Sequence, residues 1–339
     1  MSRFLADVSL QQHLALKGLT PCFMSQQNVS AVVVNWNTKK FLLQCVESLI
    51  EHSRAEPVEI VVVDNGSSDG SQQALRDRFP SVQLIAAGAN LGFARGTNLG
   101  AKASAGRYVM FVNSDTKAFP CCIGTLVHYM ESHPDVGMIT PRIIGADGKS
   151  QHVVGRLLSL SGSLSAAFGI YRENCPCCRQ LRGRGAASPG GEEVDLLMLC
   201  FAMLRREAMD QVGLLDEDFF FYGEDVDYSK RFRDKGWKLV YLPSASTFHY
   251  GGGSSERAPV RFYIELLRAR LQYFRKHHGV WGSWLCRGIL LLHMAIRLGA
   301  YAPKGLLRGA TSRESARIKV ARSWAAIRWL LTGKQPAVT

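Results

Sequence analysis

The segment between Val29 and Asp115 alternates short apolar runs with amphipathic stretches, and this alternation restricts the possible folds more than any other feature of the sequence. The apolar runs predict strands over residues 31–34, 58–63, 82–86 and 108–112. Apolar residues at helical spacing predict helices near residues 41–50, 74–79 and 97–105. Strands that alternate with helices form a parallel sheet with helices on both faces. We therefore predict an α/β fold with a Rossmann-like, mostly parallel sheet.

Polar residues stand where three of these strands end, at Asn35, Asp64 and Asp115. In open parallel sheets the carboxyl ends of the strands share one edge, and ligands bind there. We therefore expect these three side chains to converge on one site. The glycines of this segment form neither GxGxxG after the first strand nor GxxxxGK[ST]. The absence of these two motifs disfavours a dinucleotide-dependent dehydrogenase and a P-loop kinase.

The segment Phe219–Asp227 places three carboxylates directly after four aromatic residues and a glycine. Aromatic side chains prefer burial and carboxylates prefer water, so their adjacency indicates the wall of a site. A carboxylate held in such a wall can act as general base toward a hydroxyl group. The alternative is helix capping, with Asp225 and Asp227 opening a helix over residues 226–235. The two interpretations are compatible with each other.

Two further features are candidates for binding a divalent cation. Asn113-Ser114-Asp115 follows a buried strand, and a carboxylate there can hold a hard cation that bridges a substrate diphosphate. The alternative is a turn, which Asn, Ser and Asp all favour. His249 begins a glycine-rich loop over residues 249–255 and could be a second ligand, or simply a solvated or structural histidine.

The second half of the chain has a different pattern. It predicts strands over residues 136–144, 195–205 and 238–242, the last of them closed by Pro243. The stretch 155–191 is predicted to be a mobile loop over the site or a partly ordered insertion. Cys175, Cys177 and Cys178 lack a second Cys/His pair at zinc-finger spacing, so a loop with unpaired thiols is favoured over a zinc site. Because no leader segment is recognisable, we expect a cytosolic protein with reduced thiols.

Six motifs follow one another in a fixed order over about residues 29–280. They are Val32–Asn37, Val62–Gly70, Asn90–Ala94, Asn113–Asp115, Gly223–Asp227 and His249–Gly252. Together they resemble the motifs of family 2 glycosyltransferases with the GT-A fold, particularly the rhamnosyltransferase-like branch. The residues Leu199–Ala202 are bulkier than those common in relatives, which leaves the acceptor as the feature least predictable by resemblance.

The resemblance implies a role for each matching residue. At the nucleotide-sugar donor it places Asn35, Trp36, Asp64, Asn90, Arg95, Asn98 and Asn113. Trp36 would stack on the nucleobase, and Asp64 would hydrogen-bond the base or its ribose. Arg95 and Asn98 would lie near the diphosphate. Asn113 stands at the first position of the family's DxD motif, where a neutral residue makes no implied metal contact.

For the chemistry, the resemblance implies Asp225 as the catalytic base and Glu224 as a residue that orients the acceptor. Asp115 and His249 would bind Mg²⁺ or Mn²⁺ together with the donor's diphosphate. The acceptor hydroxyl would attack the anomeric carbon opposite the diphosphate and invert it in one displacement.

The implied function is transfer of a sugar, with L-rhamnose as a candidate, to a glycan or lipid-linked acceptor in cell-envelope polysaccharide synthesis. One alternative is a nucleotidyltransferase, although residues 29–115 contain few of the Lys/Arg runs that it needs. Another is an inactive glycan- or membrane-binding scaffold, although Asp115, Asp225 and His249 are all retained.

The net charge of +13 comes from the C-terminal region, which has 16 Lys and Arg but only two Glu from residue 257 onward. A basic helix is predicted over residues 260–278, and amphipathic helices over 280–302 and 316–331. Arg287 and Arg297 disfavour a transmembrane span. Opposed Trp/Leu and Lys/Arg faces favour an anionic membrane surface over packing on the catalytic domain. Nucleic acid is disfavoured, because no recognition motif accompanies the charge.

We therefore predict an N-terminal extension over residues 1–28, a catalytic domain over 29–256 and a basic helical region over 257–339. The expected location is the cytoplasm, peripheral to the inner face of the cell membrane.

Overall fold

The computed structural model describes residues 28–53, 57–168, 190–251, 259–303 and 310–334 of the 339-residue chain. Three of our predictions lie outside these residues: the N-terminal extension up to residue 27, the cysteines at 175, 177 and 178, and the end of the loop over 249–255. Of the predicted loop over 155–191, only the two ends are described.

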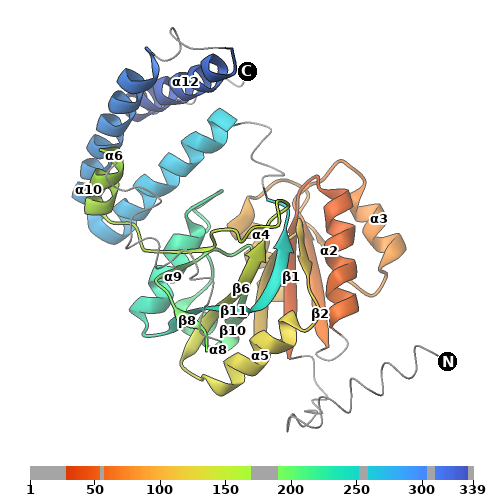
Figure 1. The fold of residues 1–339 in the computed structure, drawn as a ribbon. Helices are drawn as coiled ribbons and strands as arrows, with labels where there is room; N and C mark the ends of the chain where they lie inside the picture. Colours follow the sequence, from red (N-terminus) through yellow and green to blue (C-terminus); the bar gives the residue numbers. More distant parts are fainter. Residues whose placement is uncertain (1–27, 54–56, 169–189, 252–258, 304–309, 335–339) are drawn as a thin grey trace, which may run out of the picture.

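A nine-stranded sheet forms the centre of the described part, with helices around it (Figure 1). Its strands run in the order β3-β2-β1-β4-β10-β6-β11-β5, and β8 pairs with β11. They are β1 (Val29–Asn35), β2 (Val58–Asp64), β3 (Gln83–Ala86), β4 (Tyr108–Asn113), β5 (Thr116–Ala118), β6 (Val136–Ile144), β8 (Glu192–Glu193), β10 (Phe201–Arg205) and β11 (Lys238–His249). The pairs β1–β2, β1–β4, β2–β3 and β6–β11 are parallel, whereas β10 lies antiparallel between β4 and β6. The prediction of a mostly parallel α/β sheet is confirmed.

The helices near the sheet are α2 (Lys39–His52), α3 (Ser71–Arg78), α4 (Phe93–Ala103), α5 (Cys122–Ser132), α8 (Arg206–Val212) and α9 (Glu224–Asp234). The short helix α6 (Leu160–Ala167) instead packs on α10 (Pro259–Tyr301) (Figure 1). The connections through α2 and α3 cross the sheet in one direction, and the connection through α4 returns in the other. Right-handed crossovers therefore place α4 on the opposite face from α2 and α3. Burial on both faces explains why β1 is a nearly continuous run of fully buried apolar residues.

The strand register brings the predicted site residues to one edge. Asn35 pairs with Asp64 at the ends of β1 and β2, and Val34 pairs with Asn113 at the end of β4. The expected convergence of the strand ends is therefore present in the fold.

Two strand predictions were wrong. The predicted strand over 195–205 is broken by a turn at Leu199 and Cys200, so that β9 (Leu196–Leu197) pairs with β7 (Val154–Gly155) in a separate two-stranded sheet. The strand predicted to stop at Pro243 instead continues to His249 as β11. Its register with β6 shifts between Leu242 and Ser246, and this irregularity accommodates a proline, which has no N–H to donate to the ladder.

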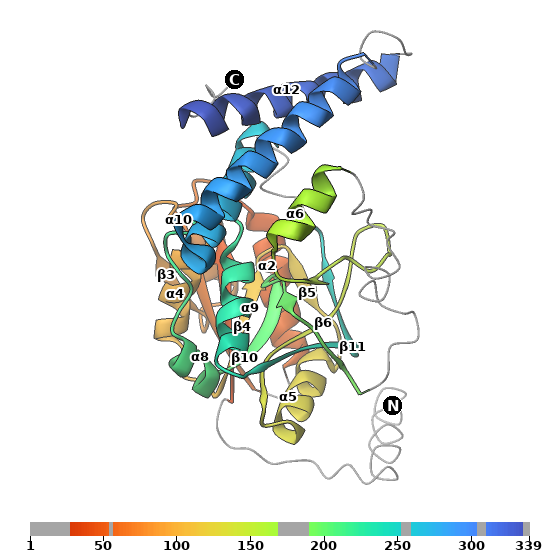
Figure 2. The same ribbon diagram turned by 90° about the vertical axis from the view of Figure 1, so that its left-hand side faces the viewer.

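Two long helices, α10 (Pro259–Tyr301) and α12 (Ala310–Thr332), extend beyond the sheet in both views (Figures 1 and 2). α10 is interrupted at Gly279, where φ is 71° and ψ is −172°, which confirms the predicted division between two helical segments. Both halves of α10 join a second apolar cluster that includes Phe219, and α10 packs on α12. By length and composition alone, Val260–Tyr301 could cross a membrane, a criterion that core helices of soluble proteins also meet.

Candidate active site

A buried hydrogen-bond network holds the ends of β1 and β2 together. Asn35 has no exposed surface, and its Nδ2 donates to Asp64 Oδ2 at 2.8 Å and to Ser67 Oγ at 3.1 Å. Thr38 Oγ1 donates to Asn35 Oδ1 at 2.7 Å and lies 2.8 Å from Ser114 Oγ. The network therefore extends from β2 across β1 to the turn after β4.

Asp64 is 1% exposed and is saturated by donors from the protein itself. Its Oδ1 accepts from the Ser67 N–H at 2.9 Å and from Gln72 Nε2 at 2.8 Å, while Oδ2 accepts from Asn35. The carboxylate thus organises the turn after β2. Its predicted contact with the nucleotide stays a prediction.

Trp36 lies directly after β1 and is partly exposed. The next residue, Asn37, has φ of 52°, a conformation that asparagine tolerates better than most residues. The Asn37 N–H donates to Ser67 Oγ at 2.9 Å, and Asn37 Oδ1 accepts from the Ser68 N–H at 2.8 Å. These bonds fix the backbone that carries Trp36 above the strand ends, where stacking on a base remains a prediction.

Three residues that follow β3 were predicted to bind the nucleotide-sugar donor, and their surroundings differ. Asn90 Oδ1 accepts from the Gly92 N–H at 3.0 Å, a bond within its own turn. Arg95 is exposed, and its Nε lies 3.5 Å from Glu217 Oε2. Asn98 is buried, and its amide bonds both the N–H and the C=O of Leu215, at 3.0 and 2.9 Å. Asn98 therefore holds the segment before α9, and Arg95 is the one of the two that solvent reaches.

The start of α4 also touches the loop before α9 directly. The Phe93 N–H donates to the Phe220 carbonyl at 3.1 Å. At Gly92, where φ is 85°, an added Cβ would lie 2.5 Å from that same carbonyl oxygen. Only a glycine allows this close approach. The predicted donor side and the carboxylate-rich loop are therefore in backbone contact.

Asp115 and His249 lie side by side, because β5 and β11 pair antiparallel next to them. His249 Nε2 is 3.1 Å from Asp115 Oδ1, and both side chains are 14% exposed. Gln151 Nε2 donates to the His249 carbonyl at 2.9 Å, which turns Gln151 Oε1 toward His249 Nδ1 at 2.7 Å. An amide oxygen can only accept, so Nδ1 carries the proton of the neutral ring.

This tautomer decides whether the pair fits a divalent cation. With the proton on Nδ1, the Nε2 lone pair of a neutral His249 points at a carboxylate oxygen, and a cation or proton is needed between them. Oxygen and imidazole donors suit Mg²⁺ or Mn²⁺, and a hydrogen bond to the second ring nitrogen is the usual support for a metal-bound histidine. Within the described residues, no group of three or more His, Cys, Asp or Glu side chains is placed to hold a metal. The pair therefore fits a cation whose other ligands come from a substrate or water.

Glu224 and Asp225 open α9 behind Gly223, whose φ is 88°. The capping interpretation was wrong in detail: Gly223 occupies the N-cap, no side chain caps the helix, and the helix begins two residues earlier than predicted. The acidic residues instead fill its first turn, where the helix dipole favours them. Asp225 Oδ1 accepts from the Val226 N–H at 2.8 Å.

The charges of Glu224 and Asp225 are disfavoured by their surroundings. Burial raises the pKa of Asp225, and burial together with the charge of Asp225 raises the pKa of Glu224. Glu224 Oε2 is buried without a hydrogen-bond partner among the described residues. Such a pair is a candidate for proton transfer, because its environment gives the two carboxyl groups different pKa values.

Cys200 connects this pair to Asp115. Burial is the main cause that raises the pKa of its thiol, and the charges of Asp115 and Asp225 raise it further. The Asn113 N–H also donates to the Cys200 carbonyl at 2.8 Å. Asp115, which pairs with His249, and Asp225 thus both act on Cys200, in the turn that replaced part of the predicted strand over 195–205.

Sequence reasoning missed two residues here. Gln151 orients His249 from 98 positions away, and no local pattern signals it. Asp227 was interpreted as a cap but is fully buried in a polar network of its own. No local pattern signals its burial, because the donors that accompany it include Lys276 and His277 from far along the chain.

Residues 30–213 match the family model described as Glycosyl transferase family 2. The chain is 32% identical over 259 residues to the N-acetylglucosaminyl-diphospho-decaprenol L-rhamnosyltransferase of Mycobacterium tuberculosis, which covers 71% of this chain and 84% of that protein. It is 23% identical to the dTDP-rhamnosyl transferase RfbF of Shigella flexneri, over 74% of this chain and 81% of the relative.

Among solved structures, the chain resembles a mannosyltransferase of Pyrobaculum calidifontis in complex with GDP-Man and Mn²⁺. The TM-score is 0.56 at 15% identity, covering 93% of this chain and 89% of that one. GalNAc-T7 with UDP, GalNAc and Mn²⁺ gives a TM-score of 0.53 at 16% identity, covering 91% of this chain and 56% of that one. At these identities the likeness establishes the fold.

Proposed function

The chain belongs to glycosyl transferase family 2, with a GT-A fold and a rhamnosyltransferase-like sequence, and from this premise we propose that it transfers L-rhamnose with inversion from a nucleoside-diphosphate donor to a lipid-linked glycan. The proposal rests on the pairing of Asp115 with His249, and on Asp115 and Asp225 both being near enough to Cys200 for their charges to raise the pKa of its thiol. The names of the two rhamnosyltransferase relatives supply the sugar, and the first of them supplies the acceptor class. We further propose a role in cell-envelope polysaccharide synthesis.

Asp225 is the proposed catalytic base. Its raised pKa makes the ionised carboxylate a stronger proton acceptor than an ordinary aspartate, and the bond from the Val226 N–H to Oδ1 fixes its orientation. Asp225 takes the proton of the acceptor hydroxyl while that oxygen forms a bond to the anomeric carbon. The bond from that carbon to the diphosphate oxygen breaks on the opposite side, so the centre inverts without a covalent enzyme intermediate.

Glu224 is proposed to orient the acceptor. A raised pKa keeps its carboxyl neutral, which avoids a second negative charge beside Asp225. A neutral carboxyl can both donate and accept a hydrogen bond. Its buried Oε2 has no partner among the described residues, so an acceptor hydroxyl would satisfy an otherwise costly group.

The donor is proposed to lie over the ends of β1, β2 and β4, with Trp36 against the base and Arg95 near the diphosphate. Asp115 and His249 would hold Mg²⁺ or Mn²⁺, and the Mn²⁺ in both structural neighbours supports that choice. When bound, the cation supplies positive charge against the departing diphosphate. Asn35 and Asp64 keep the strand ends rigid beneath the nucleotide, and Asn90 and Asn113 shape the adjoining turns.

The lipid-linked acceptor implies a membrane surface, and α10 offers a face suited to it. Beyond Gly279, Trp281 is 81% exposed and Trp284 is 59% exposed. Arg275 and Arg287 flank Trp284 in a shallow pocket. Exposed tryptophans beside arginines favour the interface of an anionic bilayer. We therefore propose a peripheral protein at the cytoplasmic face of the cell membrane.

A transfer assay tests the function. The purified chain is incubated with dTDP-L-rhamnose, Mn²⁺ and a short polyprenyl-diphosphate-linked N-acetylglucosamine, and the product is analysed by mass spectrometry and by NMR at the new anomeric carbon. We expect one added deoxyhexose with inverted configuration, abolished by chelation. Donor binding without transfer to any polyprenyl-linked acceptor, in a folded protein, would instead support an inactive scaffold.

A further inference from the structure

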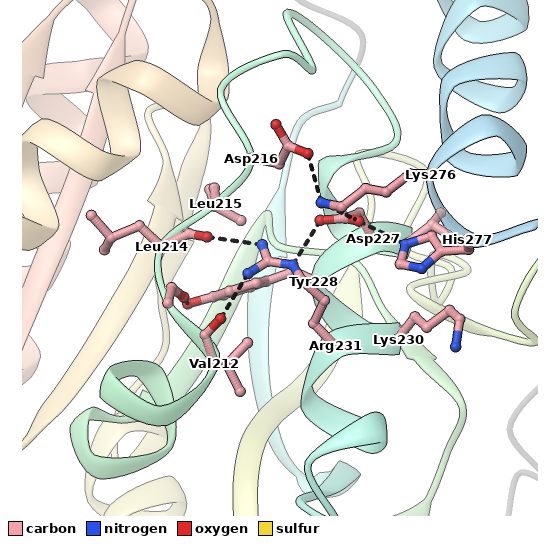
Figure 3. A network of polar contacts seen from close by, with 12 residues as sticks. Val212, Leu214, Leu215, Asp216, Asp227, Tyr228, Lys230, Arg231, Lys276 and His277 are labelled. Atoms are coloured by element: carbon pink, nitrogen blue, oxygen red, sulfur yellow. Dashed lines mark hydrogen bonds and ion pairs between the residues drawn. The ribbon is translucent and has the colours of Figure 1, made fainter. Parts of the chain in front are cut away.

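Asp227 lies at the centre of an ionic network that joins α9 to α10 (Figure 3). It has no exposed surface, although it follows Asp225 by only two residues. Its Oδ2 accepts from Arg231 Nε at 2.8 Å. Its Oδ1 is 2.8 Å from both Lys276 Nζ and His277 Nε2, which come from α10. A fully buried carboxylate thus receives three donors, two of them from the C-terminal region.

The network also contacts residues 212–216, which precede the loop before α9. Lys276 Nζ lies 2.6 Å from Asp216 Oδ2, and Arg231 donates to the carbonyls of Val212 and Leu214 at 3.0 and 2.8 Å. Burial is the main cause that lowers the pKa of His277, so it acts as a neutral N–H donor and the two acids face two permanent cations. Charge and hydrogen bonding are therefore balanced, which is the condition for burying such a network.

The start of α9 has an unusual backbone conformation and no side-chain cap. No side chain caps it, and Tyr222 and Gly223 both have positive φ, at 68° and 88°. This loop also contacts α10 directly: Phe219 belongs to the apolar cluster of Ile264 and Leu267, and a Cβ at Gly223 would lie 2.8 Å from Ala269 Cβ. The backbone that carries Asp225 is thus backed on one side by α10.

We propose that Lys276 and His277 are positioning residues for the reaction, which act through Asp227 to hold the first turn of α9 and with it the base Asp225. This inference rests on the proposed role of Asp225. It makes the first half of α10 part of the catalytic unit, whereas the sequence suggested a boundary near residue 256.

The test compares variants that keep or remove the donor at position 277. His277→Phe removes the N–H at similar volume, and His277→Gln keeps an N–H that reaches Asp227. For the transfer assay we expect kcat to fall at least tenfold in His277→Phe and to stay within threefold of wild type in His277→Gln, with the donor KM within twofold in both. Lys276→Met and Lys276→Arg form a second pair with the same expectation. Lys230→Met is the matched control, because Lys230 lies on α9 but pairs with Asp234 at the surface.

Equal kcat for His277→Phe and His277→Gln would overturn the proposal. So would a His277→Phe variant whose stabilisation by donor and Mn²⁺ in a thermal-shift assay disappears together with turnover, since that points to general folding. If the wild-type chain transfers no sugar, the proposed function fails first. If the wild type is active and all four variants match it, only the positioning role fails.

Discussion

Two regions of the site contain carboxylates with opposite surroundings. At the ends of β1 and β2, Asp64 accepts hydrogen bonds from Asn35, Ser67 and Gln72, and both of its oxygens are occupied. At the start of α9, Asp225 accepts a bond from the Val226 N–H and sits beside Glu224, whose Oε2 has no partner among the described residues. The first region is saturated by its own protein, and the second is left with unused hydrogen-bonding capacity.

This difference in hydrogen bonding indicates that Asp64 serves the fold and that Asp225 and Glu224 serve the reaction. A satisfied buried carboxylate stabilises its surroundings and gains little by meeting a substrate. An unsatisfied pair costs stability, and such costs concentrate where a substrate or a proton completes the arrangement. Substitutions in the two regions should therefore move stability and turnover in opposite ways.

The largest expected effect is on turnover, from Asp225→Asn. Removing a general base typically costs about 10²–10⁴-fold in rate, and we expect a loss of this size in kcat. Thermal unfolding should stay at the wild-type temperature or rise, because the variant no longer buries a charge beside Glu224. Transfer assays and calorimetry measure the two quantities.

The contrasting result would be a variant that unfolds several degrees lower but keeps a tenth or more of the wild-type kcat. That outcome would place Asp225 with the scaffold. Donor binding in the presence of Mn²⁺ serves as the control and should be unchanged.

Next in size is a stability effect, from Asp64→Ala. The substitution leaves the donors of Asn35, Ser67 and Gln72 without an acceptor, and we expect a loss of about 3 kcal/mol in the free energy of unfolding. Denaturant titration measures it. Gln73→Ala on α3, which removes an exposed bond to Asp77, is the control and should stay within about 0.5 kcal/mol of wild type. A stable Asp64→Ala protein that has lost donor binding would show that Asp64 serves the nucleotide and not the fold.

The sequence predicted the first region better than the second, for a physical reason. β1, β2 and β4 are apolar runs that can be recognised locally, and the pairing of Asn35 with Asp64 follows from the register of β1 and β2. The surroundings of Asp225 depend on distant parts of the chain. Its backbone is held through His277, which bonds Asp227 from 50 positions away.

Short-range rules also failed where tertiary contacts overrode them. A proline ends most strands. Pro243 instead lies within β11, where a shift of register accommodates it. Asp225 and Asp227 have the spacing of capping residues, yet Gly223 takes the N-cap because the loop arrives there with positive φ. The identities of the candidate site residues came from the ordered motifs, whereas the contacts of Gln151 and Asp227 required the structure.

The third expected effect is a change of kcat with pH, of about tenfold per pH unit. Burial raises the pKa of Asp225 to about 6 in the folded protein. A base must be ionised, so kcat should be at its plateau above pH 7 and should fall tenfold per unit as pH drops below about 6. Stability should change in the opposite direction. A raised carboxyl pKa favours the protonated folded state, so the cost of burying this pair is absent near pH 4 and grows as pH rises through the folded pKa.

Rate profiles and unfolding midpoints between pH 5 and 8 measure both trends, and Asp225→Asn should weaken the pH dependence of stability. A kcat that is flat down to pH 5 would mean that the base titrates like an ordinary aspartate, and the contrast with the saturated region would disappear.

The smallest expected effect is at the joint between the two regions, where Asn98 on α4 bonds Leu215 and Glu217 in the segment before α9. Asn98→Ala should cost about 1–2 kcal/mol in the free energy of unfolding, because the Leu215 N–H loses its acceptor. Turnover should fall only a few-fold, since the Phe93 N–H still bonds the Phe220 carbonyl. The readouts are denaturant titration and the separate kcat and donor KM. The alternative role for Asn98, contact with the donor diphosphate, gives a different pattern: unchanged stability with a donor KM raised tenfold or more. Those two patterns cannot both occur, so one variant decides whether Asn98 ties the saturated region to the unsatisfied one or binds the substrate between them.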